Sequence, residues 1–408
     1  MLVKSVNFSQ VGEVSRFEAE VRAETAIQPE FTIRFDVHAP VEPPPTSGDA
    51  WLAALLAPAM FAGEDLEIRA PVSRRLTRTI TEVQAILHAW FPVLLKRITV
   101  RTPLIALPTA SAPEEDGAVV FFSGGVDSWY SLWKNRESVS DLLTVKGFDI
   151  PYQDQTIWPE EVAVHRQIAG EMGKHLITVE TDIRDKVNPS GGCFQRPLAE
   201  DFWGRAWHGS CLAAIGLLLQ NRYSQVIIPS SWQYTRLQPW GSHPMLDLLW
   251  CNGKVEFLHD GAEASRVDKI RVVSGLDTAL RHLRVCAADP PAQYHNCGTC
   301  EKCRRTMLTL RLFGVLDRVK MFDRALDLRE AETMAVSPHV FPLYHEILAE
   351  AEARGDAEVV RLVRILIGES LSARRLWHRF STSVVPRWKR SVRKRVKRLK
   401  SLNPASAR

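Results

Sequence analysis

The sequence predicts an α/β protein with a doubly wound parallel sheet at its centre, an α+β extension before the sheet, and a cysteine-rich and helical region after it. Between residues 118 and 285, short runs of apolar residues alternate with segments of helical periodicity. Strands that are apolar along their whole length and are joined by helices indicate a parallel sheet covered on both faces. The expected strands are residues 118–122, 142–148, 176–180 and 226–229. Helices are expected around residues 162–172 and 206–219.

The N-terminal region, residues 1–101, predicts an α+β domain of its own. Apolar and polar residues alternate over residues 17–23 and 31–37, and this period of two is typical of half-buried antiparallel strands. A helix with one apolar face is expected over residues 73–90. Residues 102–117 are rich in proline, alanine and acidic residues and lack periodicity, so a linker between domains is expected there.

A short polar turn follows the first strand of the sheet. Residues 123–128 read Ser-Gly-Gly-Val-Asp-Ser and lead into a helix. The two glycines let the backbone approach an anion closely, and the serine hydroxyls with the unpaired amides of the helix start can bind phosphate oxygens. Asp127 would repel a bare phosphate, so it indicates a bridging Mg²⁺. The alternative is a simple turn in which a serine caps the helix.

Four of the seven cysteines are clustered after the sheet region, within residues 286–314. Their spacing supplies four thiolates in a short stretch with two overlapping C-x-x-C turns, as a tetrahedral structural Zn²⁺ prefers. An iron–sulfur cluster also uses four cysteines and stays open as an alternative. The N-terminus shows no export signal, which favours metal binding over disulfides. The expected metal ligands are Cys286, Cys297, Cys300 and Cys303.

The turn at residues 123–128 resembles the signature of the PP-loop ATP pyrophosphatases. A Walker loop would instead need Gly-Lys-Ser/Thr and would hold ATP for transfer of the γ-phosphate. The resemblance implies the adenine nucleotide alpha hydrolase-like fold, cleavage of ATP between its α- and β-phosphates, and transfer of AMP to a substrate oxygen. Pyrophosphate is the group that the loop would hold.

The order of loop, parallel sheet and four cysteines resembles one branch of these enzymes, the 7-cyano-7-deazaguanine synthases and their relatives. The resemblance covers about residues 117–314 and implies a ligase that joins a carboxylate to ammonia with ATP, and zinc on the cysteines. It extends to Gly147, Phe148 and Asp149, where family members hold adenosine. The chain departs from this branch at residues 150–153 and 203–206, which leaves the acceptor substrate open. The nucleotide-binding residues that the resemblance implies are Ser123, Gly124, Gly125, Val126, Asp127, Ser128, Phe148 and Asp149.

Positive charge is needed near the phosphate loop, because charge moves onto the pyrophosphate as it leaves. Arg266 and Lys269 lie in a polar, glycine-broken stretch that follows the sheet, and they are the expected cations. With Asp127 they form the expected catalytic set. The alternative interpretation places Arg266 and Lys269 on a solvated helix face.

The C-terminal part divides into a helical region, 315–370, and a basic tail, 371–408. Helical periodicity over residues 340–353 and 357–367 predicts a hairpin about Gly355. The tail contains 13 Lys and Arg and no acidic residue, so the rest of the chain carries −8 within a total net charge of +5. Such a segment can bind RNA or an anionic membrane surface, or form a solvated terminus.

The sequence therefore predicts a cytoplasmic, AMP-forming ligase or amidotransferase of C–N bonds that adenylates a small carboxylate or amide-type substrate and uses ATP, Mg²⁺ and Zn²⁺. The expected partners are a small acidic substrate, a donor of ammonia or an amine, and a second copy of the chain in a homodimer. No stretch is apolar for the roughly 20 residues that a bilayer requires. Two alternatives stay open: base modification of RNA, such as thiolation, and a non-catalytic nucleotide-binding module.

Overall fold

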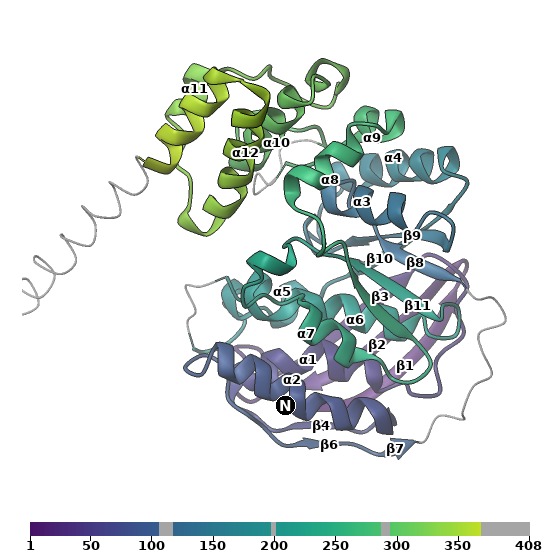
Figure 1. Cartoon of the computed structure of the whole chain (residues 1–408). Coiled ribbons are helices and arrows are strands. Elements are labelled where there is room, and N and C mark those ends of the chain that lie inside the picture. Colours follow the sequence, from purple (N-terminus) through teal and green to yellow (C-terminus); the bar gives the residue numbers. More distant parts are fainter. Residues whose placement is uncertain (106–116, 197–200, 287–293, 369–408) are drawn as a thin grey trace, which may run out of the picture.

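The structure is a computed structural model that describes residues 1–105, 117–196, 201–286 and 294–368 (Figure 1). A ten-stranded sheet runs through it in the order β12-β11-β8-β9-β10-β3-β2-β1-β4-β6. Each strand that the sequence predicts between residues 118 and 229 is present, so the α/β class and the largely parallel central sheet are confirmed. The parallel strands are β8 (Ala118–Phe121), β9 (Val139–Lys146), β10 (His175–Thr181), β11 (Gln225–Pro229) and β12 (Glu256–Asp260).

The strand β12 is not predicted by the sequence pattern. It pairs in parallel with β11 along its whole length and ends in two polar residues, His259 and Asp260. Polar residues at the end of a short strand weaken the apolar signal on which sequence reading depends. The hydrogen bonds of the neighbouring strand hold this segment in the sheet regardless of its polarity.

The chain winds outward from β8 in both directions. It adds β9 and β10 on one side and then returns to add β11 and β12 on the other. In such a sheet, ligands bind outside the carboxyl ends of the strands where the winding reverses, which is here between β8 and β11. One face is covered by α3 (Val126–Lys134), α4 (Ile157–Glu171), α8 (Arg266–Val273) and α9 (Asp277–His282) (Figure 1). The other face is covered by α1 (Asp49–Ala62), α6 (His208–Leu218) and α7 (Pro244–Asp247).

Residues 1–101 extend this sheet, which differs from the separate N-terminal domain that the sequence suggests. The expected antiparallel pair is present as β2 and β3, and β3 pairs antiparallel with β10. The helix α1 is buried from Asp49 to Phe61 and packs against α6. Because a helix that is apolar on all sides must be covered on all sides, α1 joins both regions in one core. The N-terminal strands are β1 (Leu2–Val11), β2 (Val14–Arg22), β3 (Glu30–Val37), β4 (Leu66–Ile68) and β6 (Val100–Arg101).

A second helix of the N-terminal region, α2 (Arg74–Trp90), confirms the helix predicted over residues 73–90. The side chain of Ser73 accepts a hydrogen bond of 3.3 Å from the amide of Leu76 and so caps the helix. Short strands β5 (Val72–Ser73) and β7 (Leu104–Ile105) form a small parallel sheet beside it. Most of the expected linker, residues 106–116, lies outside the described residues.

The C-terminal region is helical, as predicted. Its helices are α10 (Glu301–Leu312), α11 (Leu328–Glu332), α12 (Phe341–Arg354) and a further helix over residues 357–368. Gly355 ends α12 in the left-handed conformation, with φ +74°, and confirms the predicted hairpin. Among the described residues, no helix has both the length and the apolar character that crossing a bilayer requires. The basic tail, 371–408, lies outside the described residues.

Candidate functional site

The predicted phosphate loop lies between β8 and α3, at the carboxyl end of the sheet. Gly125 is the residue before α3, and no side chain caps the helix there. The hydroxyl of Ser128 donates to the carbonyl of Gly125 at 3.0 Å and accepts from the amide of Ser123 at 3.4 Å. This geometry disfavours the alternative of a serine-capped turn, since no side chain of the described residues accepts from the first amides of α3, which can therefore bind an anion.

A buried histidine lies directly beneath the loop. Gly124 has φ +70°, and a Cβ at this position would lie 3.1 Å from Nε2 of His165. The ring of His165 is held through Nδ1, which lies 2.8 Å from the hydroxyl of Thr144. Burial, followed by the positive charges of Arg284 and His282, lowers the pKa of His165 to about 3. The ring is therefore neutral, and it supports the loop in a conformation that only glycine adopts without strain.

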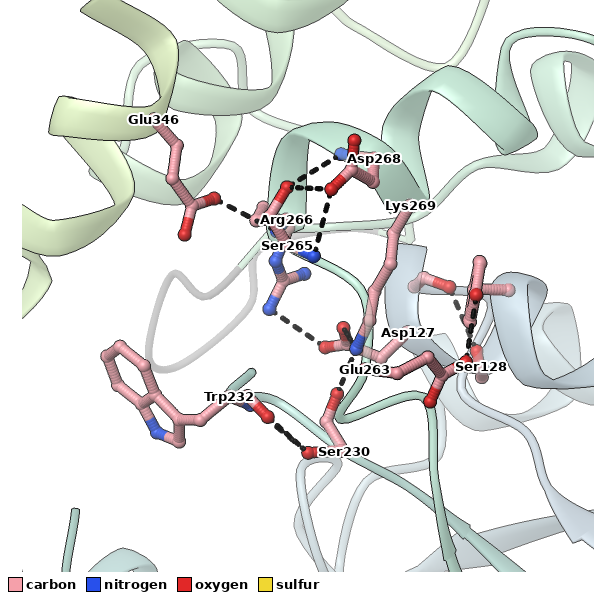
Figure 2. A network of polar contacts seen from close by, with 12 residues as sticks. Asp127, Ser128, Ser230, Trp232, Glu263, Ser265, Arg266, Asp268, Lys269 and Glu346 are labelled. Carbon is pink, nitrogen blue, oxygen red and sulfur yellow. Dashed lines mark hydrogen bonds and ion pairs between the residues drawn. The ribbon is translucent and has the colours of Figure 1, made fainter. Parts of the chain in front are cut away.

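The three predicted catalytic residues lie together, although they come from distant parts of the chain. Arg266 and Lys269 project from the start of α8 toward Asp127 in the first turn of α3 (Figure 2). A guanidinium nitrogen of Arg266 lies 2.8 Å from one carboxylate oxygen of Asp127, and Nζ of Lys269 lies 3.1 Å from the other. Nζ of Lys269 also donates to the carbonyl of Ser230 at 2.5 Å. With 1% of its surface exposed, Lys269 is not on a solvated helix face.

The start of α8 is fixed by its own hydrogen bonds. Ser265 and Asp268 form a reciprocal capping box, in which each side chain accepts from the other residue's amide. The amide of Arg266 donates to a carboxylate oxygen of Glu346 on α12 at 3.0 Å. These contacts hold the backbone that carries both cations, so the cations are positioned before any ligand binds.

The electrostatics of this network keep Asp127 charged. Burial would raise the pKa of Asp127, but the charges of Arg266 and Lys269 outweigh it and lower the pKa. Burial lowers the pKa of Lys269 against the attraction of Asp127. Each oxygen of Asp127 has a cationic partner, so Asp127 positions both cations. A carboxylate has about four lone pairs, so binding of Mg²⁺ by Asp127 stays a prediction.

A cavity of about 540 Å³ opens beside the loop. Its volume lies within the range of about 300 to 1,000 Å³ that is typical of small-molecule sites. Phe148 packs on the ring of Trp203 at 4.8 Å between centroids, and its carbonyl accepts a hydrogen bond from Arg184. Gly124 and Lys269 are not among the lining residues. The predicted residues that line the cavity are Ser123, Gly125, Val126, Asp127, Ser128, Phe148, Asp149, Arg266 and Cys286.

Sequence reasoning missed four charged residues that also line this cavity. They are Glu161 on α4, Arg284 after α9, and Lys302 and Arg305 on α10. The spacing of three between Lys302 and Arg305, just inside a helix that begins at the cysteine cluster, was a usable signal that both share one helix face. No local pattern marks Glu161 or Arg284, because the sheet and the cysteine cluster bring them to the cavity.

The carboxyl group of Glu161 is buried, with 5% of the residue exposed. Its Oε2 has no hydrogen-bond partner among the described residues and lies 3.9 Å from a guanidinium nitrogen of Arg284. Burial raises the pKa of Glu161 to about 7, and the charge of Arg284 only partly opposes this effect. The group is therefore close to half protonated at neutral pH.

Replacing Glu161 by glutamine is expected to change how stability depends on pH. The folded-state pKa of about 7 lies above the ordinary glutamate value of 4.5, so the stability of the native chain falls as pH rises through this window. The free energy of unfolding of Glu161→Gln relative to native should rise by roughly 3 kcal/mol between pH 5 and 8. Urea unfolding of both proteins at four pH values measures this difference in unfolding free energy. Glu160→Gln, at an exposed position beside it, is the control, and a pH-independent difference for Glu161→Gln would contradict the prediction.

The four predicted metal ligands converge. The sulfur atoms of Cys286, Cys297, Cys300 and Cys303 all lie within 4.8 Å of one another. The pair Cys286 and Cys300 is separated by 4.0 Å, and the pair Cys297 and Cys303 by 3.9 Å. Four thiolates around one zinc ion at about 2.3 Å are about 3.8 Å apart, whereas a disulfide would need about 2.0 Å. The cluster can therefore hold a single metal ion such as zinc.

Hydrogen bonds to sulfur support the same conclusion. The sulfur of Cys297 accepts from the amide of Thr299 at 3.4 Å, from its hydroxyl at 3.3 Å, and from the amide of Cys300 at 3.3 Å. Such donors stabilise a thiolate and orient it toward a metal. Four protein ligands close a tetrahedral site and leave no open position, which is typical of a structural ion.

The site thus contains an uncapped loop at the switch point of the sheet, two cations on one carboxylate, a cavity and a four-cysteine cluster.

Comparison of the chain with protein-family models and with curated proteins gives no match.

Proposed function

We propose that this chain is an ATP pyrophosphatase-type ligase of the PP-loop superfamily that adenylates a small carboxylate and passes the acyl group to ammonia or an amine. The observation that carries the proposal is the loop at residues 123–128, which faces the cavity with uncapped amides and with Arg266 beside it. These groups suit a triphosphate, because they supply amide donors, hydroxyl donors and a fixed positive charge.

In this proposal, the amides at the start of α3 and the hydroxyl of Ser123 bind the β- and γ-phosphates, and the hydroxyl of Ser128 turns from the carbonyl of Gly125 to the phosphates when they bind. A carboxylate oxygen of the substrate attacks the α-phosphorus, the bond from that phosphorus to the bridging oxygen breaks, and pyrophosphate leaves. Arg266 stabilises the charge that gathers on the pyrophosphate. Lys269 acts through Asp127, by holding the carboxylate that orients Arg266. Ammonia or an amine then attacks the acyl carbon, AMP leaves, and the nitrogen loses a proton to solvent.

Two ions accompany the proposal. Mg²⁺ would neutralise phosphate charge at the loop, with Asp127 as its proposed carboxylate ligand. Zn²⁺ fits the four cysteines, where it would serve folding and positioning because the site is closed.

The test is formation of AMP and pyrophosphate by the full chain with ATP, a panel of carboxylates and ammonium. We expect both products in equal amounts, dependent on one acceptor. Ser128→Ala should lower the rate by about a hundredfold, because one donor to the phosphates is lost. Ser138→Ala, an exposed serine beyond the end of α3, is the matched control. ADP as the product, or no binding of ATP, would refute the proposal.

The same assay separates the alternatives. Pyrophosphate release that requires added RNA would favour base modification. Binding of ATP without AMP under every acceptor would favour a non-catalytic nucleotide-binding module.

A further inference from the structure

The cysteine cluster borders the cavity. Cys286 itself lines the cavity, and Cys300 is the residue before α10. Three residues of the first turns of α10, Lys302, Arg305 and Thr306, line the same wall. Arg305 is held by Glu301 in the same helix at 2.6 Å, whereas no carboxylate of the described residues lies within ion-pair distance of Lys302.

A short segment connects this cluster to the phosphate loop. The amide of Arg284 donates to the carbonyl of Gly124 at 2.9 Å, so residues 283–286 lie against the loop. On the other side, Oδ1 of Asn296 accepts from the amides of Val285 at 2.7 Å and Cys286 at 3.0 Å. Nδ2 of Asn296 donates to the carbonyl of Leu283 at 2.7 Å.

Asn296 is fully buried and directly precedes Cys297. Cys286 and Cys297 are both members of the cluster, so a metal ion there would hold both ends of this hydrogen-bonded unit together. The position of Arg284 on the phosphate loop therefore depends on the same contacts that bring the cysteines together.

The side chain of Arg284 is 9% exposed and is aimed by its own contacts. Its Nε donates to the carbonyl of Tyr294 at 3.0 Å, and the guanidinium lies over the Tyr294 ring. Lys302 lines the same cavity as Asp127. Burial raises the pKa of Asp127, and the charge of Lys302 helps those of Arg266 and Lys269 to lower it. Arg284, whose backbone lies against the loop, and Lys302 on α10 thus line the same cavity as the loop.

We propose that the metal centre controls nucleotide affinity, because it fixes Arg284 and Lys302 as a second cationic wall that binds the phosphates. This inference rests on the proposed binding of ATP. Without the ion, four neighbouring thiols lose their common partner, α10 loses its anchored start, and Lys302 must be ordered at the moment of binding. Since coupling between two binding events is reciprocal, a bound phosphate must also retain the metal.

The test measures equilibrium binding of inorganic pyrophosphate and of ATP to the full chain, with zinc and after chelation. Lys302→Ala in the zinc-loaded chain is expected to weaken both by about tenfold, as for loss of one charge-assisted hydrogen bond. Lys320→Ala, an exposed lysine of the same region, should not change them. Chelation of the zinc should weaken binding of both ligands at least as much as Lys302→Ala does. In the chelated chain, Lys302→Ala should cause little further loss of affinity.

A second measurement does not require the metal-free chain to keep its fold. Saturating pyrophosphate is expected to slow the release of zinc to a chelator severalfold in the native chain, but not in Lys302→Ala. A role of the metal in folding alone would leave the rate of zinc release independent of pyrophosphate.

The outcomes distinguish this inference from the proposed function. If the zinc-loaded native chain binds neither ATP nor pyrophosphate, the proposed function fails and this inference falls with it. If binding depends on Ser128 but is unchanged by Lys302→Ala, and zinc release ignores pyrophosphate, the metal centre does not control affinity while the proposed function stands.

Discussion

Replacing Lys269 by methionine is expected to lower the free energy of unfolding by about 3 kcal/mol, because it removes one partner of a buried ion pair. The change leaves one oxygen of Asp127 and the carbonyl of Ser230 without their donor. This loss of unfolding free energy lies at the lower end of the range for broken buried ion pairs, because Arg266 continues to neutralise Asp127. Pyrophosphate release should fall about a hundredfold, as Asp127 then holds Arg266 less firmly. Chemical denaturation and the product assay measure the two effects.

The double variant Asp127→Asn with Lys269→Met provides the sharper control. Because the two residues are in contact, the double variant should be more stable than the sum of the single effects by about 1 to 3 kcal/mol. Lys320→Met removes an exposed lysine and should leave stability and turnover unchanged. Strictly additive effects at Asp127 and Lys269 would show that the ion pair contributes nothing to the fold.

Replacing Gly147 by alanine is expected to destabilise the fold by more than about 4 kcal/mol, so that little soluble protein forms. Gly147 follows β9 with φ +96°, and a Cβ there would lie 1.8 Å from the carbonyl oxygen of Thr181 at the end of β10. The ends of these paired strands would have to separate, and Phe148 and Asp149 would leave the cavity wall. Soluble yield and thermal unfolding measure the effect.

The matched control is Gly173→Ala. Gly173 also has a positive φ, +65°, but a Cβ added there would meet no atom within 4 Å. Only the backbone strain remains, which costs roughly 1 to 2 kcal/mol. Equal destabilisation by both substitutions would mean that the contact with Thr181 is not decisive.

Local patterns were sufficient for much of the fold. The strands β8, β9, β10 and β11 are short apolar runs, and burial on both faces of a parallel sheet requires such runs. The helix α2 was readable because one apolar face repeats at helical spacing. The cysteine cluster was readable because its ligands all lie between Cys286 and Cys303, so that spacing alone constrains their geometry.

Contacts between distant segments were not readable in this way. From the sequence alone, Arg266 and Lys269 could be either catalytic residues or part of a solvated helix face. Their partner Asp127 is 142 residues from Lys269, so no local pattern relates them. Likewise α1 is uniformly apolar, and nothing in its own residues shows that α6 covers it. The sequence also did not show that the oxygens of Asp127 contact two cations, because those cations come from another element.

By itself, the sequence determined the α/β class, the position of the loop at residues 123–128 and the four cysteines that can hold a metal. Each of these features is formed by residues that are close together in the sequence, so periodicity and spacing are enough to predict it. Only the tertiary structure decided that the N-terminal strands extend the main sheet, that Asp127 holds two cations, and that Glu161, Arg284 and Lys302 line the same cavity. These features depend on the winding of the sheet, which brings together side chains that no local pattern relates.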